Sequence, residues 1–153
     1  MAADNAWTSQ DIPEQTDRIA IVTGANSGIG YETARALAHK GATVVMACRS
    51  ETRGAAAGQC ILAERPQGQV ELEHLDLADL SSVQRFASRF KEDHDRLDLL
   101  INNAGVMMPP RRVETAGGFE LQFGTNHLGH FALTGLLLDH LLRTPGARVV
   151  GVS

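Results

Sequence analysis

Short apolar runs alternate with longer segments in which apolar residues recur every three or four positions, from residue 18 to the end of the chain. The runs are rich in Val, Ile and Leu, which is typical of strands buried on both faces of a parallel sheet. The longer segments have helical periodicity, as in Val83, Phe86 and Phe90. The pattern predicts strands at 18–23, 43–48, 70–75, 97–101 and 147–152, and helices at 29–40, 50–65, 80–94 and 119–142.

Strands that alternate with helices along a whole chain indicate an α/β fold, a parallel sheet covered on both faces with right-handed crossovers. The polar and apolar residues at 70–75 alternate, so we expect this strand to be less buried than the others. Gly124 predicts a break in the helix at 119–142. We expect an N-terminal arm at 1–17 and one domain at 18–153.

Composition and charge exclude several classes of protein. The net charge of −4 argues against nucleic acid or an anionic membrane surface as a partner. The apolar stretch from Phe131 to Leu142 contains Thr134, Asp139 and His140, so we expect no membrane span. The acidic start is unlike a signal peptide, and two cysteines make no disulfide framework. We therefore expect a cytoplasmic protein.

The last predicted strand ends the chain. Val149, Val150 and Val152 are typical of a central parallel strand, whose faces are normally covered by helices. We therefore expect a truncated chain whose domain is incomplete on its C-terminal side. The alternative is that this strand is a short native edge.

A glycine-rich segment, Thr-Gly-Ala-Asn-Ser-Gly-Ile-Gly at 23–30, lies between the first strand and the first helix. Gly24 would allow a sharp turn, Gly28 a close approach of backbone to a pyrophosphate, and Gly30 tight helix packing. The spacing is not the common G-x-G-x-x-G, but its place between strand and helix predicts phosphate binding at the helix N-terminus. A purely structural turn is the alternative. The predicted cofactor residues here are Gly24, Asn26, Ser27, Gly28, Ile29 and Gly30.

Three motifs together resemble the short-chain dehydrogenase/reductase family. They are Thr-Gly-x-x-x-Gly-Ile-Gly at 23–30, Asn-Asn-Ala-Gly at 102–105, and Gly-Phe-Glu-Leu-Gln-Phe-Gly-Thr-Asn-His-Leu-Gly-His-Phe at 118–131. The third is similar to the branch that contains retinol dehydrogenase-like proteins and related bacterial reductases, as is the arm at 11–16. The resemblance implies a Rossmann-type doubly wound sheet of order 3-2-1-4-5, with the cofactor at the switch point between its first and fourth strands.

The residues after the second strand indicate which nucleotide binds. NAD-specific folds place a carboxylate there for the ribose 2′-hydroxyl, whereas this chain has Cys48, Arg49 and Ser50. The Arg49 guanidinium suits a 2′-phosphate, so we expect NADP(H) rather than NAD(H), with Ser50 as a second ligand. An arginine that merely lies on the surface is the alternative.

Further cofactor residues follow the third and fourth strands. The resemblance implies an adenine contact at Asp76, with Leu77 beside the ring, although an aspartate in a loop can instead cap a helix. Asn103, Ala104 and Gly105 would line the cofactor ribose, partly in a structural role.

The chemistry of the family is hydride transfer between the nicotinamide and a carbonyl or alcohol carbon of the substrate. For this chain we expect a hydrophobic substrate. The resemblance implies a catalytic Asn126, which anchors a proton-relay water; a core asparagine that kinks the helix is the alternative. The single tyrosine, Tyr31, is followed four residues later by Arg35, so the family's Tyr-x-x-x-Lys would lie beyond residue 153. We therefore expect this chain alone only to bind cofactor, and Ser153 to neighbour the catalytic serine.

Other readings of the sequence remain open. His127 and His130 have a spacing that can bind metal, but no third ligand accompanies them, so we expect no metal site. The chain can instead be a non-catalytic NADP(H)-binding module, or an interaction subunit completed by another chain. The family resemblance implies a homodimer or tetramer for a full-length parent.

Overall fold

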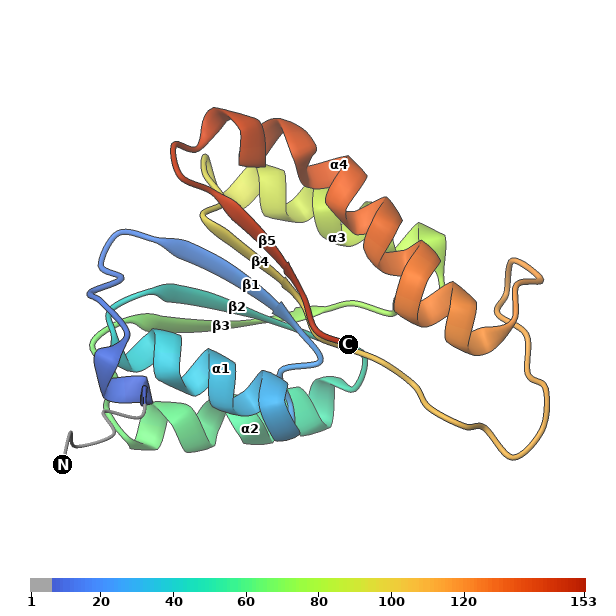
Figure 1. The fold of residues 1–153 in the computed structure, drawn as a ribbon, viewed down its shortest axis with the longest axis horizontal. Helices are drawn as coiled ribbons and strands as arrows, with labels where there is room; N and C mark the ends of the chain where they lie inside the picture. Colours follow the sequence, from blue (N-terminus) through green and yellow to red (C-terminus); the bar gives the residue numbers. More distant parts are fainter. Residues whose placement is uncertain (1–6) are drawn as a thin grey trace, which may run out of the picture.

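The computed structural model describes residues 7–153, which form a five-stranded, fully parallel sheet between two layers of helices (Figure 1). The strand order is β3-β2-β1-β4-β5, so the predicted doubly wound topology is confirmed. The elements are β1 Ile19–Thr23, α1 Gly28–His39, β2 Thr43–Cys48, α2 Glu51–Ala63, β3 Gln69–His74, α3 Leu80–Asp93, β4 Leu99–Asn102, a π-helical segment Phe123–Gly129, α4 His130–Arg143 and β5 Arg148–Gly151.

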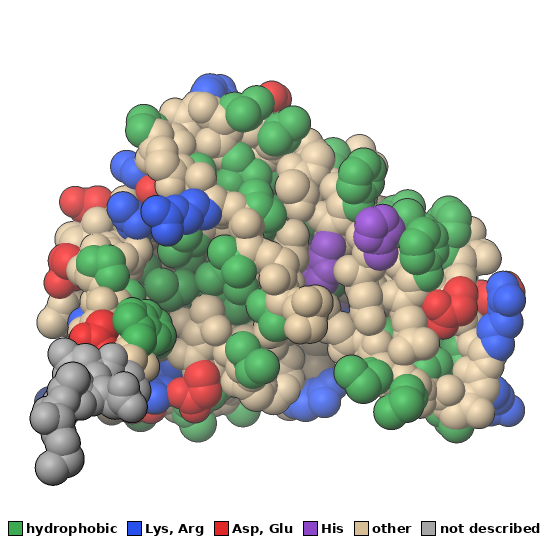
Figure 2. Space-filling model, viewed as in Figure 1, with side chains coloured by type: hydrophobic (Ala, Val, Ile, Leu, Met, Phe, Trp, Pro, Cys, Tyr) green, Lys and Arg blue, Asp and Glu red, His purple; other side chains and the backbone are tan. Residues whose placement is uncertain are grey.

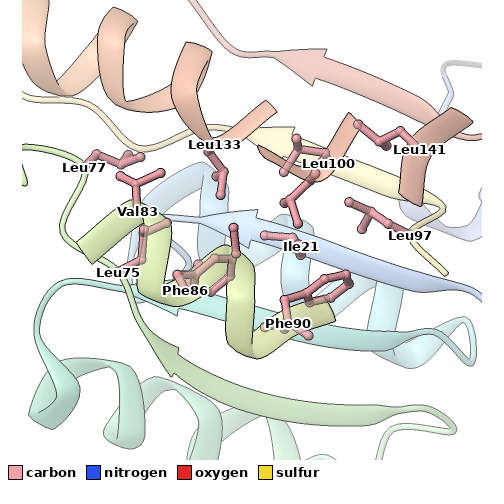
Figure 3. Close-up of a cluster of buried hydrophobic side chains, with 14 residues drawn as sticks. Ile21, Leu75, Leu77, Val83, Phe86, Phe90, Leu97, Leu100, Leu133 and Leu141 are labelled. Carbon is pink, nitrogen blue, oxygen red and sulfur yellow. The ribbon is translucent and has the colours of Figure 1, made fainter. Parts of the chain in front are cut away.

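Alternate residues of the central strand point to opposite faces of the sheet. Ala20 and Val22 belong to the core cluster beneath α1 and α2, whereas Ile21 belongs to the cluster beneath α3 and α4. Figure 3 shows this second cluster, in which Leu100 of β4 and Phe86 of α3 pack around Ile21. Because both faces are covered, the strand has no polar face, which explains the continuous apolar run in the sequence.

The two edge strands are less buried than the centre. The four inner residues of β3 are partly exposed, which confirms the expectation from their alternating pattern. In β5 every residue is exposed; Val149 keeps 47% and Val150 42% of its accessible surface.

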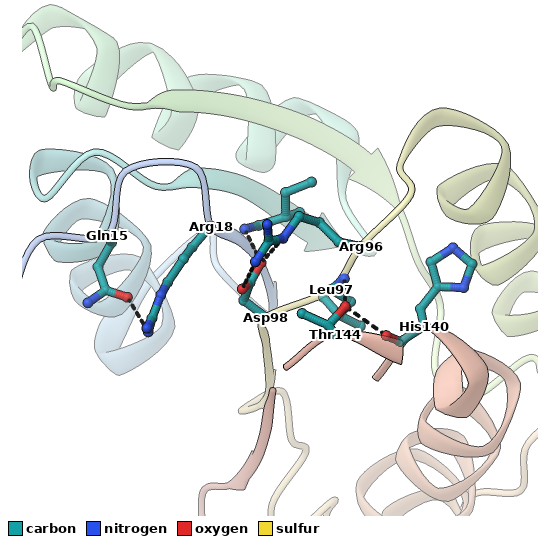
Figure 4. A network of polar contacts seen from close by, with 8 residues as sticks. Gln15, Arg18, Arg96, Leu97, Asp98, His140 and Thr144 are labelled. Atoms are coloured by element: carbon teal, nitrogen blue, oxygen red, sulfur yellow. Dashed lines mark hydrogen bonds and ion pairs between the residues drawn. The ribbon is translucent and has the colours of Figure 1, made fainter. Parts of the chain in front are cut away.

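Polar contacts fix the strands where they begin (Figure 4). The buried Asp98 carboxylate accepts hydrogen bonds from the Ile19 N–H at 2.9 Å and from the Arg96 guanidinium at 2.7 and 2.9 Å. The Thr144 hydroxyl, after α4, accepts from the Leu97 N–H at 3.1 Å. These bonds connect β1, the segment before β4 and the end of α4 at the amino ends of the strands. The glycine turn lies at the opposite, carboxyl ends.

The predicted arm, 1–17, is described from residue 7 onward, and its first six residues lie outside the description. Gln15 is buried, and its N–H donates to the carbonyl of Lys40 at 2.7 Å. The Lys40 ammonium in turn donates to the carbonyl of Gln10 at 2.8 Å. The arm is thus attached to the end of α1. Within residues 7–153, no helix combines the length and the apolar character that crossing a membrane requires.

The predicted start of the fourth helix at Phe119 is wrong. Glu120 forms an isolated antiparallel bridge with Glu114, and helical backbone begins at Leu121. The Glu120 carboxylate caps this start, because it accepts from the N–H groups of Gln122 at 3.0 Å and Phe123 at 2.8 Å. These bonds lower the pKa of Glu120. The predicted break near Gly124 is confirmed as the π-helical segment.

Candidate functional site

The glycine turn connects β1 to α1 at the carboxyl edge of the sheet, next to the end of β4. Gly24 has φ +67°, and a Cβ there would lie 3.0 Å from Cα and Cβ of Ala104. Glycine is therefore required both by the left-handed backbone and by the closeness of the segment after β4. Such an approach holds the two predicted cofactor segments against each other.

The other two glycines of the turn differ in their surroundings. A Cβ on Gly30 would overlap the side-chain amide of Asn103 and lie 2.5 Å from the carbonyl oxygen of Gly24. Gly28, with φ +57°, would meet nothing within 4 Å. Gly30 is thus a packing position, although its neighbours belong to the turn and the β4 segment rather than to the sheet. Gly28 and Ile29 present an exposed first helical turn.

A pocket of about 370 Å³, here called the β1–β2 pocket, opens beside this turn. It gathers ten of the thirteen predicted cofactor residues, and Gly28, Ile29 and Gly30 adjoin it without lining it. Five further residues line it and were not predicted: Ala47, Arg53, Leu75, Val106 and Thr125. The complete lining is Gly24, Asn26, Ser27, Ala47, Arg49, Ser50, Arg53, Leu75, Asp76, Leu77, Asn103, Ala104, Gly105, Val106 and Thr125.

Two arginines stand on one side of this pocket. Arg49 follows β2 and is exposed, and Arg53 lies in the first turn of α2. Ser50 between them is the N-cap of α2, and its hydroxyl accepts from the Arg53 N–H at 3.4 Å. The helix N-terminus adds its positive dipole end to these two guanidinium groups, so this side favours an anion.

Asp76 and Leu77 form the wall after β3. One Asp76 carboxylate oxygen accepts from the Ala78 N–H at 2.9 Å. Asp79 is the residue that caps α3, with its carboxylate accepting from the Ser81 N–H at 2.9 Å. Asp76 is therefore not the helix cap that the alternative required, and its side chain lines the pocket.

The Thr125 hydroxyl is a polar atom in need of a partner. Thr125 keeps only 7% of its accessible surface, and its hydroxyl oxygen has no hydrogen-bond partner within the described part of the chain. A buried polar group without a partner costs about 1–3 kcal/mol, so such groups usually mark a ligand or water position. Thr125 is also among the residues that line the β1–β2 pocket.

A second hollow of about 570 Å³, the β4–β5 pocket, continues from the first along the shared wall Asn103–Val106. It also contains Asn126, His130 and Phe131. The Asn126 amide is fixed in place, because its oxygen accepts from the Val106 N–H at 2.8 Å and its nitrogen donates to the Val106 carbonyl at 2.9 Å. The two pockets share this wall and lie along the carboxyl ends of β1, β2, β4 and β5.

His130 is buried and uses both ring nitrogens. Nδ1 lies 3.0 Å from the carbonyl oxygen of Asn126, and Nε2 lies 2.9 Å from the hydroxyl of Thr23. Burial lowers the pKa of His130, against the opposing effect of the hydrogen bond to Asn126. Neither nitrogen is left for a metal ion, because one contacts the Asn126 carbonyl and the other the Thr23 hydroxyl.

Tyr31 lies on α1 and lines neither pocket. Burial, the largest influence, raises the pKa of its phenol. This is opposite to the change that proton transfer by a tyrosine at neutral pH requires.

Comparison with known proteins is consistent with this geometry. The model of the short chain dehydrogenase family matches residues 18–153. Mouse retinol dehydrogenase 12 is 50% identical over 136 residues, 89% of this chain and 43% of that protein. Zebrafish polyprenol dehydrogenase is 48% identical over 147 residues, 94% of this chain and 45% of that protein. The chain therefore spans less than half the length of these relatives.

Solved structures share the fold as well. The Pseudomonas aeruginosa RhlG structure, an active-site complex with NADP, has 31% sequence identity and a TM-score of 0.74. The superposition covers 89% of this chain and 52% of that one.

Proposed function

Because the chain belongs to the short-chain dehydrogenase family, we propose that it binds NADP(H) in the two joined pockets, as the cofactor-binding part of an oxidoreductase. The observation that carries this proposal is the β1–β2 pocket, which brings the glycine turn, two arginines and Asp76 to one cavity. The NADP in the RhlG complex supports the choice of nucleotide.

The residues fit a dinucleotide in one direction. The adenine would lie against Asp76 and Leu77, and the pyrophosphate against the N–H groups of the first turn of α1, where Gly28 leaves open space. Asn103, Ala104 and Gly105 would line the ribose near the nicotinamide, which would enter the β4–β5 pocket.

Arg49 and Arg53 would select NADP(H) over NAD(H). Their guanidinium groups flank the capped start of α2, where a ribose 2′-phosphate would receive charge-assisted hydrogen bonds. The carboxylate that binds a free 2′-hydroxyl in NAD-specific folds is absent after β2, where the chain reads Cys48, Arg49 and Ser50.

The substrate would be a hydrophobic carbonyl or alcohol. Met107, Phe131 and Val152 give the β4–β5 pocket an apolar wall. Two relatives are named for hydrophobic alcohols, retinol and polyprenol, which supports this class. The bound cofactor would supply or accept the hydride, and Asn126 would hold a proton-relay water. Since Tyr31 is unsuited to proton transfer, residues 1–153 alone would bind the cofactor without completing the reaction.

Assembly and compartment follow the same family reading. Phe131 and Leu142 of α4 keep 73% and 75% of their accessible surface, and Figure 2 shows hydrophobic side chains gathered over this helix. This surface supports a homodimer or tetramer through α4 in a full-length parent.

Cys48 and Cys60 are free thiols, as expected for a protein of the reducing cytoplasm.

The test is titration of NADPH and NADH into the chain and into Arg49→Ala and Arg53→Ala variants. Loss of one charge-assisted bond should weaken NADPH binding by about 10- to 100-fold and leave NADH binding nearly unchanged. Arg85→Ala, at an exposed pair with Asp79 on α3, is the control and should change neither affinity. An unchanged ratio of the two affinities in both pocket variants would refute the selection of NADP(H).

A further inference from the structure

The imidazole of His130 has one defined tautomer. The Asn126 carbonyl can only accept, so Nδ1 carries the proton and donates across the 3.0 Å contact. The lowered pKa keeps the ring neutral, which leaves Nε2 as a lone pair. Nε2 therefore accepts the hydroxyl proton of Thr23 across 2.9 Å.

The hydroxyl of Thr23 is then fully used. It has one proton, which points to His130 Nε2 at 2.9 Å with the carbonyl of Ile101 as a second, more distant acceptor at 3.4 Å, and two lone pairs, which accept from the N–H groups of Asn103 and Ala104 at 2.9 Å each. The carbonyl of Thr23 also accepts from the Asn103 side-chain amide at 2.9 Å. Thr23 is completely buried, so a proton that loses His130 is left with the more distant carbonyl of Ile101 and a weaker hydrogen bond.

Three segments of the pocket meet at this imidazole–hydroxyl pair. Thr23 immediately precedes Gly24 of the glycine turn, and Asn103 and Ala104 form the shared wall of the two pockets. On the other side of the ring is Asn126, whose side chain is fixed by Val106 and whose carbonyl is held by His130. A chain of hydrogen bonds through the ring thus connects the glycine turn to the π-helical segment.

Resting on the proposed function, we propose that His130 is a positioning residue for the nicotinamide half of the cofactor. Through its two hydrogen bonds it fixes the positions of the Asn126 backbone and of the shared wall relative to the glycine turn. His130 lines the β4–β5 pocket and not the β1–β2 pocket, so its influence should be larger on the nicotinamide half of the ligand than on the adenosine half. Small displacements of a wall that orients a ligand weaken the interactions made there.

The experiment compares two ligands in the full chain: NADPH, and adenosine 2′,5′-bisphosphate, which carries only the adenosine half. His130→Leu should weaken NADPH binding about tenfold, since the Asn126 carbonyl loses its donor and the Thr23 hydroxyl its nearer acceptor, and should weaken the bisphosphate clearly less. His130→Asn should recover most of the NADPH affinity, because its amide can still donate to Asn126. If the ring only filled space, leucine would be the better replacement.

Four results would overturn this inference. Equal weakening of both ligands would mean a general effect on folding, and no weakening of either would mean no role. Should the variants not fold, ¹⁵N NMR of the unaltered chain decides: a protonated Nε2 or a charged ring at pH near 7 contradicts the proposal, and an Nδ1–H tautomer supports it. Failure of the unaltered chain to bind NADPH would instead refute the proposed function, and this inference with it.

Discussion

Gly30→Ala adds one methyl group where the glycine turn is most crowded. The new Cβ would lie 2.5 Å from the Gly24 carbonyl oxygen and overlap the Asn103 amide. The carbonyl is backbone and cannot rotate away. The amide is held by its 2.9 Å hydrogen bond to the carbonyl of Thr23. Either the start of α1 moves outward or that bond breaks.

The size of the effect follows from three contributions. Overpacking costs about 1–3 kcal/mol, and loss of the Asn103 bond costs about 1 kcal/mol more. Alanine is favoured over glycine inside a helix by about 1 kcal/mol, which offsets part of this. We expect Gly30→Ala to lower the free energy of unfolding by about 1–3 kcal/mol.

Urea unfolding followed by circular dichroism measures this change. The matched control is Gly135→Ala in α4, where a Cβ would meet nothing within 4 Å. It should raise the free energy of unfolding by about 0.5–1 kcal/mol, so the two substitutions should have opposite signs. A Gly30→Ala chain as stable as the unaltered one would refute the packing argument.

Two further predictions concern the core and its buried histidine. Leu100→Ala removes a completely buried side chain and should lower the free energy of unfolding by about 2–5 kcal/mol, whereas Leu142→Ala, 75% exposed, should change it by less than about 0.5 kcal/mol. Because burial lowers the pKa of His130 in the folded chain, its contribution to stability is present above about pH 6.5 and is lost as pH falls through the folded value. Urea unfolding at about pH 7.5 and about pH 5.5 should therefore show a smaller acid loss in His130→Asn than in the unaltered chain; equal losses would contradict this assignment.

Most of the fold could be predicted from the sequence because both faces of the sheet are buried. The continuous run from Thr43 to Cys48 gave strand β2 with its observed ends, and the helical period of Val83, Phe86 and Phe90 gave α3. The other strand boundaries were predicted within two residues. The start of the fourth helix could not be predicted from the pattern. Phe119 continues the apolar period of the helix, but the Glu120 carboxylate caps the backbone that follows it.

Residues of the candidate site could be predicted only where one segment carries its own pattern. The glycine turn and Arg49 are such cases, and both border the β1–β2 pocket. Arg53 follows Ser50 by three residues, so the predicted helix could have suggested it. The role of His130 could not be found, because its partner Thr23 is 107 positions away and meets it only when α4 packs on the sheet. Thr125 has no sequence signal, since only burial makes its hydroxyl unusual.

The strand order also sets the sequence in which the molecule can assemble. The β3-β2-β1 half is built from contiguous residues, whereas Ile21 reaches its β4 partner Leu100 only after all of α3 has been made. Closing so long a loop is slow, and synthesis proceeds from the N-terminus. A three-stranded half can therefore form on the ribosome with α1 and α2 on one face. Its other face, with Ile21 and Val45, stays open until α3 and α4 emerge, and it is the surface that a chaperone would protect during synthesis.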